Sequence, residues 1–302
     1  MSIVEKTFRN GDIIVNEGAN GNSFFQLIEG RAFVYAGYGN NDQIRLATLE
    51  AGEFFGEMAI LEAYPRSATV VATGTVHVIE IPGDELYGFL AEDTDRIYKL
   101  MQHLGDRLAA TSADCAEANE LLKQLREADA EKKTSLFSKI KKHMDVYQSS
   151  KSKTSAPGKE SISDEFAKLE NAGTGRIRSY SKGMIIFREG DVDNNMYILH
   201  EGTIGIYGNY RKREEEKHAE YNAVSFFGET GILYGDTRSA SAVADTGNTV
   251  VESISREDLG ELFAVCPGKI LLILRHLSYR LRQIDSDFLA VCKEITETYN
   301  KK

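Results

Sequence analysis

The residues best suited to chemistry in this sequence are Gly56, Glu57 and Arg66, which lie close together. Gly56 opens a predicted helix directly after a predicted strand, so free backbone N–H groups can face an anion there. Arg66 adds a planar cation that can hold two phosphate oxygens. Glu57 would repel phosphate, but it can accept hydrogen bonds from ribose hydroxyls. The set could hold the sugar–phosphate part of a nucleotide, but these three residues alone favour the alternative, an exposed Glu–Arg pair of little energetic value.

The same combination occurs twice, because the sequence contains an internal repeat. FFGEMAILEAYPRSATVVA (54–72) aligns without a gap with FFGETGILYGDTRSASAVA (226–244), at an offset of 172. The register extends well beyond these segments, which excludes chance similarity and predicts two copies of one domain. Glu229 and Arg238 are the second copies of the first Glu and Arg.

The elements around these residues are short strands followed by helices. In each copy, β-branched and aromatic stretches alternate with Gly, Asn and Asp, a pattern typical of a β-sandwich or barrel. Helical sequence begins only near residues 84 and 257. Strands followed by helices predict an α+β fold in each copy.

The helical stretches carry apolar residues at alternating steps of four and three, which predicts a coiled-coil-like helix pair. Such helices can pair within one chain as a pseudo-dimer or between two chains as a homodimer; the alternative is that each helix packs on its own β domain. The positions are Ile97, Met101, Leu104, Leu108, Thr111, Cys115, Ala118, Leu122 and Leu125, then Ile270, Leu274, Leu277, Leu281, Ile284, Phe288, Val291 and Ile295.

Between the copies lies a basic segment, residues 131–160, with eight Lys against three acidic residues. We interpret it as a solvated flexible linker rather than a docking segment for an acidic partner. Leu136, Ile140 and Met144 are spaced for one short amphipathic helix. The predicted domains are 1–130, the linker 131–172, and 173–302.

Composition limits the classes of function. A net charge of −10 argues against broad nonspecific binding to DNA or anionic lipid. No apolar run approaches the roughly 18 residues of a membrane span, and no signal peptide is visible. Three widely spaced cysteines argue against disulfides or zinc and predict a cytoplasmic protein. The sequence shows no catalytic constellation and no metal-ligand spacing, so we expect neither an enzyme nor a metal site.

The two Glu–Arg segments resemble the phosphate-binding cassette of cyclic-nucleotide-binding domains, the family of the catabolite activator protein and the regulatory subunits of protein kinase A. The shared pattern reads FGEMAIL then PRSAT in the first copy, and FGETGIL then TRSAS in the second. The resemblance covers roughly 8–126 and 175–298. It implies two jelly-roll-like β-roll domains of eight strands, each followed by a long C-terminal helix, with a cyclic nucleotide bound inside.

The resemblance also assigns roles to residues. Glu57 and Glu229 would bind the ribose 2′-OH, and Arg66 and Arg238 the cyclic phosphate. Thr230 departs from the apolar residue usual after the Glu. The other expected site residues are Gly56, Met58, Ala59, Ser67 and Ala68 in the first copy, and Gly228, Thr230, Gly231, Ser239 and Ala240 in the second.

Residues 107–112 resemble a stretch of the dimer helix of the catabolite activator protein. Thr and Ser of that stretch contact adenine there, the Ser from the partner helix. Arg107, Thr111 and Ser112 are therefore further expected site residues in the first copy, and cAMP is favoured over cGMP, which stays possible. The second copy has Ile284 and Asp285 at the Thr and Ser positions, so base recognition must differ there.

We therefore expect a non-catalytic cAMP receptor that signals allosterically to an unidentified effector protein, without direct contact to DNA or membrane. One alternative is a ligand-free interaction protein with degenerate sites, for which the second copy is the better candidate. The other is a catabolite-activator-like transcription regulator. The second helical stretch reaches nearly to Lys302, which leaves no room for a DNA-binding helix-turn-helix.

Overall fold

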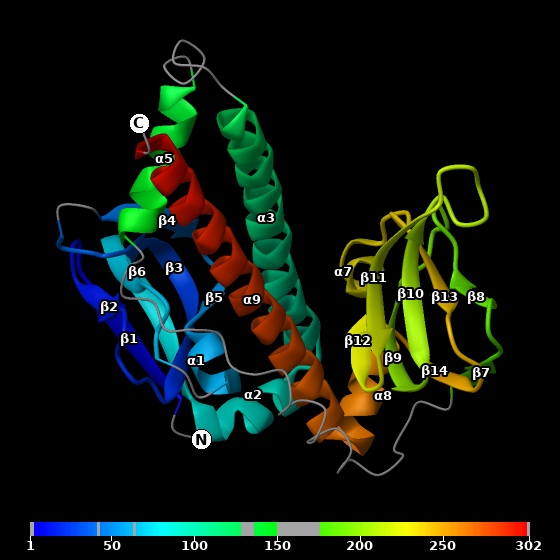
Figure 1. Ribbon diagram of the computed structural model, residues 1–302. Coiled ribbons are helices and arrows are strands. Elements are labelled where there is room, and N and C mark those ends of the chain that lie inside the picture. The colour runs from blue at the N-terminus through cyan, green and yellow to red at the C-terminus, as the bar shows by residue number, and fades with distance from the viewer. Residues whose placement is uncertain (1–2, 41–42, 63–64, 128–135, 150–175, 301–302) are drawn as a thin grey trace. The chain divides into compact units, whose positions relative to one another are not determined.

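The structure is a computed structural model that describes residues 3–40, 43–62, 65–127, 136–149 and 176–300 (Figure 1). Contacts divide the chain into two compact units, and each unit contains one β-roll. Unit 1 comprises Met1–Phe89, Asp106–Pro157 and Leu277–Lys302, and unit 2 comprises Leu90–Gly105 and Gly158–His276. These units group the helices differently from the repeat, so the domain boundaries taken from the repeat stay a prediction.

The first roll is a six-stranded antiparallel sheet with strand order β1-β6-β3-β4, in which β2 pairs with β6 and β5 with β3. Its long strands β3 and β6 pair along most of their length and change register on either side of Glu29. The elements are β1 Val4–Phe8, β2 Ile13–Val15, β3 Ser23–Ala36, β4 Ile44–Leu49, β5 Phe54–Phe55, α1 Glu57–Glu62 and β6 Thr69–Pro82.

The second roll has eight strands in two sheets, with orders β11-β10-β13-β8 and β12-β9-β14-β7. The strands β9 and β10 together occupy the place of β3. Gly202, with φ +87°, separates them, and its counterpart Gly30 has φ +91° within β3. The elements are β7 Ile177–Tyr180, β8 Ile185–Phe187, β9 Asn195–Glu201, β10 Thr203–Gly208, β11 Glu216–Asn222, β12 Ser225–Phe227, α7 Glu229–Tyr234, β13 Ser241–Ala244 and β14 Thr249–Ser255.

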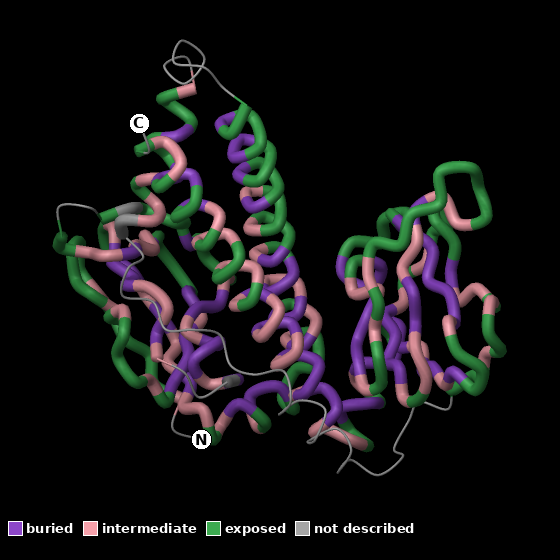
Figure 2. The backbone as a smooth tube through the Cα atoms, in the orientation of Figure 1, coloured by how far each residue is buried: buried purple, intermediate pink, exposed green. Residues whose placement is uncertain are grey.

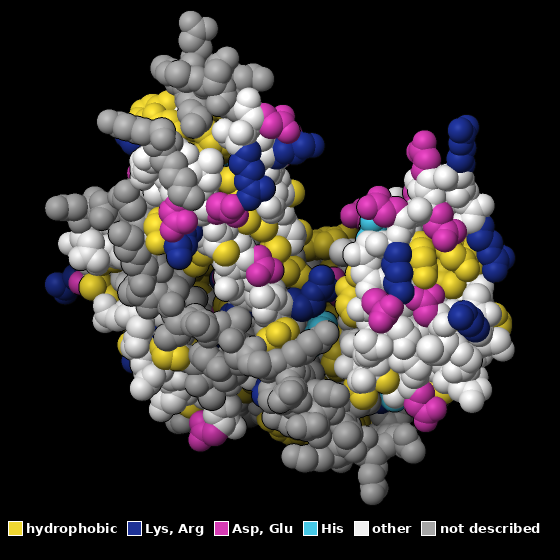
Figure 3. Space-filling model, viewed as in Figure 1, with side chains coloured by type: hydrophobic (Ala, Val, Ile, Leu, Met, Phe, Trp, Pro, Cys, Tyr) yellow, Lys and Arg dark blue, Asp and Glu magenta, His cyan; other side chains and the backbone are white. Residues whose placement is uncertain are grey.

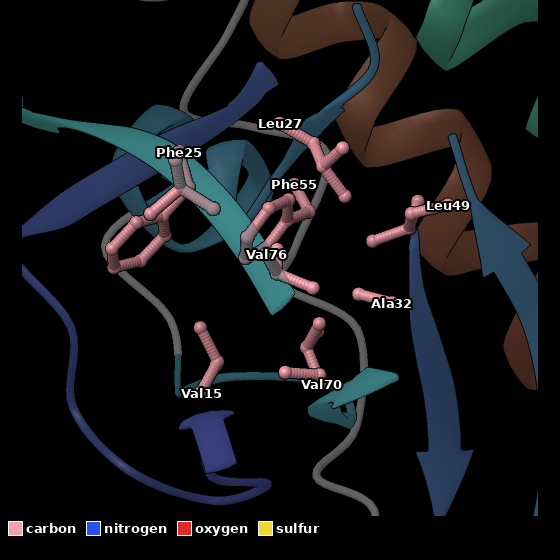
Figure 4. Close-up of a cluster of buried hydrophobic side chains, with 10 residues drawn as sticks. Val15, Phe25, Leu27, Ala32, Leu49, Phe55, Val70 and Val76 are labelled. Carbon is pink, nitrogen blue, oxygen red and sulfur yellow. The ribbon is translucent and has the colours of Figure 1, made fainter. Parts of the chain in front are cut away.

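Each roll has its own apolar core, to which its strands contribute buried residues (Figure 2). In the first roll, Phe25 and Phe55 stack with ring centroids 5.1 Å apart, and Val76 packs beside them (Figure 4). In the second roll, Tyr197 and Phe227 stack at 5.3 Å. The predicted α+β fold with two β-rolls is confirmed, and the eight strands expected in each roll are found in the second; the first has six, because β3 and β6 each run unbroken where the second roll has two strands.

Helices follow the strands in both copies, as the sequence predicts. Among the described residues, no single helix is long and apolar enough to span a membrane; α8 and α9 reach that threshold only jointly, across a bend of 117°. The helices are the 3₁₀ turn Gly83–Glu85, α2 Leu86–Glu92, α3 Asp95–Arg126, α5 Phe137–Ser149, α8 Asp258–Val265 and α9 Pro267–Asn300.

Within unit 1, the C-terminal parts of α3 and α9 contribute with α5 to one apolar cluster, and α3 and α9 run in the same direction (Figure 1). Leu122 and Ile295, which are equivalent in the repeat, share one apolar cluster, and Arg126 pairs with Glu294. Seam residues of both long helices therefore meet in one cluster inside the chain, and the choice between an intrachain pseudo-dimer and a homodimer stays a prediction.

The short amphipathic helix predicted within the basic linker is present at residues 137–149, but it is docked rather than solvated. These residues form α5, whose Ile140 is fully buried in the cluster between α3 and α9, with Leu136 and Met144 packed against it. Lys142 lies 3.5 Å from Asp114 of α3. On the face of the molecule shown in Figure 3, acidic and basic side chains are interspersed. The amphipathic spacing outweighs the basic composition because it lets α5 bury an apolar face. Residues 150–172 lie outside the described residues.

We predict that Ile140→Ala lowers the free energy of unfolding by about 2–5 kcal/mol, because it leaves a cavity between three helices. Urea denaturation followed by circular dichroism measures this change. The control is Lys141→Ala, because Lys141 is exposed on the same helix. Equal stability of the two variants would contradict the docking of α5.

Candidate functional site

The first cassette, which we define as Gly56–Ala59 and Arg66–Ala68, begins where β5 ends and α1 starts. Gly56 makes this junction with φ +79°, a conformation that favours glycine. A Cβ atom at Gly56 would lie 2.4 Å from Nη1 of Arg66, and one at Gly21 would lie 2.2 Å from Nε. Two glycines therefore let the backbone approach the guanidinium closely.

Arg66 is buried, with 7% of its surface exposed. Its Nη1 donates to the carbonyl oxygen of Gly56 at 2.6 Å, and its Nη2 donates to the carbonyl oxygen of Ser23. Burial lowers the pKa of Arg66, an effect that the negative charges of Glu57 and Glu80 oppose. In the described part of the chain both hydrogen bonds of this guanidinium go to neutral carbonyl groups. A guanidinium has five N–H donors, so donors remain for an anion.

Glu57 is also buried, at 2% exposure, and its Oε1 lies 3.1 Å from Nη1 of Arg107 on α3. The same nitrogen lies 3.3 Å from the sulfur of Met58. From α9, Nη2 of Arg282 donates to the carbonyl oxygen of Met58 at 3.3 Å. Both long helices of unit 1 thus contact the short helix α1 that carries the cassette. The Arg282 contact was not predicted, because it depends on how α9 packs.

The other predicted residues of the first site lie around this centre. Met58 and Ala59 are buried, and Ser67 and Ala68 are half-buried. Thr111 is half-buried one turn beyond Arg107 on α3, and Ser112 next to it is exposed. The structure therefore brings Arg107 to the cassette and leaves Thr111 and Ser112 further along the helix.

The second cassette, Gly228–Gly231 and Arg238–Ala240, has the same backbone arrangement. Gly228 has φ +70° and precedes α7. Arg238, at 4% exposure, donates through Nη1 to the carbonyl oxygen of Gly228 at 2.7 Å and through Nη2 to that of Asn195 at 2.5 Å. Its guanidinium carbon lies 4.2 Å from the ring centroid of Phe187. Glu229 is only half-buried, unlike Glu57, and Thr230 and Ser239 are exposed.

The two cassettes differ in one charged contact. Nη2 of Arg238 lies 2.8 Å from Oδ2 of Asp193, and both side chains are largely buried. Burial raises the pKa of Asp193, but hydrogen bonds from Tyr197, Arg238 and Asn195 outweigh this and lower it below its ordinary value. Burial and the bond to Asp193 raise the pKa of Tyr197. The repeat contained the signal that could have predicted this contact, since Asp193 aligns with Gly21.

Among the described residues, no group of three or more His, Cys, Asp or Glu side chains is arranged to hold a metal ion. Each cassette presents a buried guanidinium beside backbone groups, an arrangement suited to an anion. In the first cassette a buried carboxylate suited to accepting hydroxyl hydrogen bonds follows Gly56 directly.

Comparison with known proteins matches both rolls to one domain. The pattern of the cyclic nucleotide-binding domain matches residues 5–93 and 177–265. A cAMP-dependent protein kinase regulatory subunit of Dictyostelium discoideum is 21% identical over 268 residues, which are 87% of this chain and 66% of the relative. A cGMP-dependent protein kinase of Plasmodium berghei (strain Anka) is 26% identical over 303 residues, 97% of this chain and 28% of the relative.

Among solved structures, cAMP-bound PfPKA-R is similar to this chain at 20% identity and a TM-score of 0.38, covering 89% of this chain and 75% of its own. The chain spans about two thirds of the Dictyostelium relative and under a third of the Plasmodium relative.

We predict that Asp193→Asn destabilises the fold by about 1–3 kcal/mol at pH 7, because it replaces a charge-assisted hydrogen bond by a neutral one. The folded pKa of Asp193 is depressed, so its stabilisation is complete above the ordinary value of 3.8 and is lost as the pH falls through the folded value. The difference in unfolding free energy between the two proteins should therefore shrink on acidification. Urea denaturation from pH 7 to pH 3 measures it, and a difference that grows towards pH 3 would contradict the ion pair.

Proposed function

This chain belongs to the cyclic nucleotide-binding domain family, and on that premise we propose that it is a cAMP receptor that regulates another protein allosterically and catalyses no reaction itself. The first roll holds the ligand. Arg66 binds the cyclic phosphate, and Glu57 accepts a hydrogen bond from the ribose 2′-OH.

The observation that carries this proposal is the environment of Arg66. A buried guanidinium is costly unless anionic or polar groups compensate its charge. Its hydrogen bonds within the described chain go to two carbonyl groups, of Gly56 and Ser23. Glu57 and Glu80 act on this charge from nearby, and a phosphate would add an anion in direct hydrogen-bond contact, where charge-assisted hydrogen bonds are strong.

Glu57 supports the nucleotide rather than a simple phosphate. A buried carboxylate repels free phosphate, but it binds a ligand whose hydroxyl group reaches it while its phosphate reaches Arg66. Arg107 holds Glu57 in position from α3 through a contact of 3.1 Å. Thr111, one turn further on α3, is the residue we propose for the adenine base. This assignment makes cAMP the expected ligand and leaves cGMP as the comparison to be measured.

Contacts of α1 with both long helices suggest how binding reaches an effector. Arg107 on α3 contacts Glu57, and Arg282 on α9 contacts the backbone of Met58. A ligand that binds Glu57 changes the contacts of α1 with α3 and α9. It can therefore favour one arrangement of these helices over another, which is what an allosteric ligand must do. We propose that an effector protein recognises this helix pair, and that the chain acts in the cytoplasm.

We predict that Arg66→Ala weakens cAMP binding by about 2–5 kcal/mol, because the phosphate loses its charged partner. Isothermal titration with cAMP and, separately, cGMP measures this. The control is Arg31→Ala, since Arg31 on β3 has a 56% exposed side chain that pairs with Glu50. Unchanged cAMP affinity in Arg66→Ala would overturn the proposed function.

The role of Glu57 has its own test with 2′-deoxy-cAMP. In the unmodified protein, losing a hydrogen bond to a charged acceptor should cost about 1.5–3 kcal/mol of binding. In Glu57→Gln the acceptor is neutral, so the penalty should fall to about 0.5–1.5 kcal/mol. Competition titration of both nucleotides against both proteins gives the two penalties. Equal penalties would show that the 2′-OH is not read by Glu57.

A further inference from the structure

Of the residues around Arg238 that differ from their counterparts around Arg66, four are Asp193 and its neighbours, and a fifth, Phe187 in place of Val15, lies with its ring against the guanidinium. Of the four, one supplies the carboxylate, two donate hydrogen bonds to it, and one makes space for its backbone. These four replacements are Asp193 for Gly21, Asn195 for Ser23, Tyr197 for Phe25 and Gly231 for Ala59.

Three residues donate hydrogen bonds to the carboxylate of Asp193. Tyr197 donates its hydroxyl hydrogen to Oδ2 at 2.5 Å, and Arg238 donates to the same oxygen at 2.8 Å. Asn195 donates its side-chain amide to Oδ1 at 2.5 Å and its backbone N–H to the same atom at 3.1 Å. Phe25, the counterpart of Tyr197, has no hydroxyl group. The second roll thus has side-chain donors for a carboxylate at a place where the first roll has glycine.

Gly231 leaves space for the backbone of Asp193 and for the guanidinium of Arg238. A Cβ atom at Gly231 would lie 2.3 Å from the carbonyl oxygen of Asp193 and 2.5 Å from Nη1 of Arg238, distances that no side chain tolerates. The first cassette has Ala59 at this position, so a Cβ atom is present there. Gly231 therefore lets the backbone at residue 193 and the guanidinium of Arg238 approach α7 closely, whereas the carboxylate of Asp193 is held by its side-chain donors.

We propose that Asp193 is a resident anion of the second roll, which occupies at Arg238 the place that the phosphate of cAMP takes at Arg66. This inference rests on the proposed role of Arg66. A cyclic phosphate approaching Arg238 meets a carboxylate already bound to the same guanidinium, and juxtaposed like charges strongly disfavour binding. The second roll is therefore closed to cyclic nucleotides, and the chain binds one ligand.

The test uses the full chain with the first site removed by Arg66→Ala, so that any cAMP binding measured comes from the second roll. Isothermal titration should detect no cAMP binding to Arg66→Ala. Adding Asp193→Gly, which installs the residue of the first roll, should create one site per chain, with affinity raised by more than about 100-fold. Adding Arg238→Ala to that double variant should remove the new site.

Two further variants control for charge and for folding. In the Arg66→Ala chain, Asp193→Asn keeps the side-chain volume but removes the charge, so it should restore weaker yet measurable binding. Asp191→Asn changes an exposed neighbouring carboxylate that accepts a hydrogen bond from the backbone of Arg188, and it should restore none. Thermal melting establishes that each variant is folded.

Two results would overturn the inference. One is cAMP binding by Arg66→Ala that disappears with Arg238→Ala, because the second roll would then bind ligand beside Asp193. The other is a folded Asp193→Gly and a folded Asp193→Asn variant that both gain no binding. A failure of the proposed function appears separately, as an unmodified chain whose first roll does not bind.

Discussion

Each roll is organised around a buried guanidinium, whose charge must be compensated where water is scarce. The surrounding backbone meets part of this need in the same way in both copies, through carbonyl oxygens at the end of a strand and at the glycine before a short helix. The remaining charge decides what each roll can bind. In the proposed function the first roll leaves it for a ligand, whereas in the second roll Asp193 pairs with the guanidinium from within the chain.

The two cassettes therefore differ in the ligands that they suit. The first cassette combines a buried Arg66 with a buried Glu57 held by Arg107, which suits a ligand carrying both a phosphate and a ribose hydroxyl. The second cassette keeps the same fold but has a half-buried Glu229 and an internal ion pair. The second copy also supplies α9, whose C-terminal part packs in unit 1.

The helices connect the first cassette to the rest of unit 1. Because α3 and α9 run in parallel and share an apolar cluster, each copy of the repeat contributes one long helix to unit 1. Arg107 and Arg282 bring both helices to α1, while α5 buries Ile140 against them further along. A displacement of α1 on ligand binding would therefore be transmitted to a packed three-helix cluster rather than to isolated side chains.

The sequence by itself determined the repeat, the β-roll fold, the heptad seam and the Glu and Arg of each cassette, because these depend on local patterns and on spacing that two copies share. It also indicated an amphipathic stretch at Leu136, Ile140 and Met144, although basic composition favoured a solvated linker. Only the tertiary structure decided that α5 docks, that seam residues of α3 and α9 meet inside the chain, and that Asp193 reaches Arg238. Ion pairing and docking depend on distances that exist only once the chain has folded, such as the 2.8 Å between Asp193 and Arg238; the repeat and the apolar patterns mark the residues involved but not these distances.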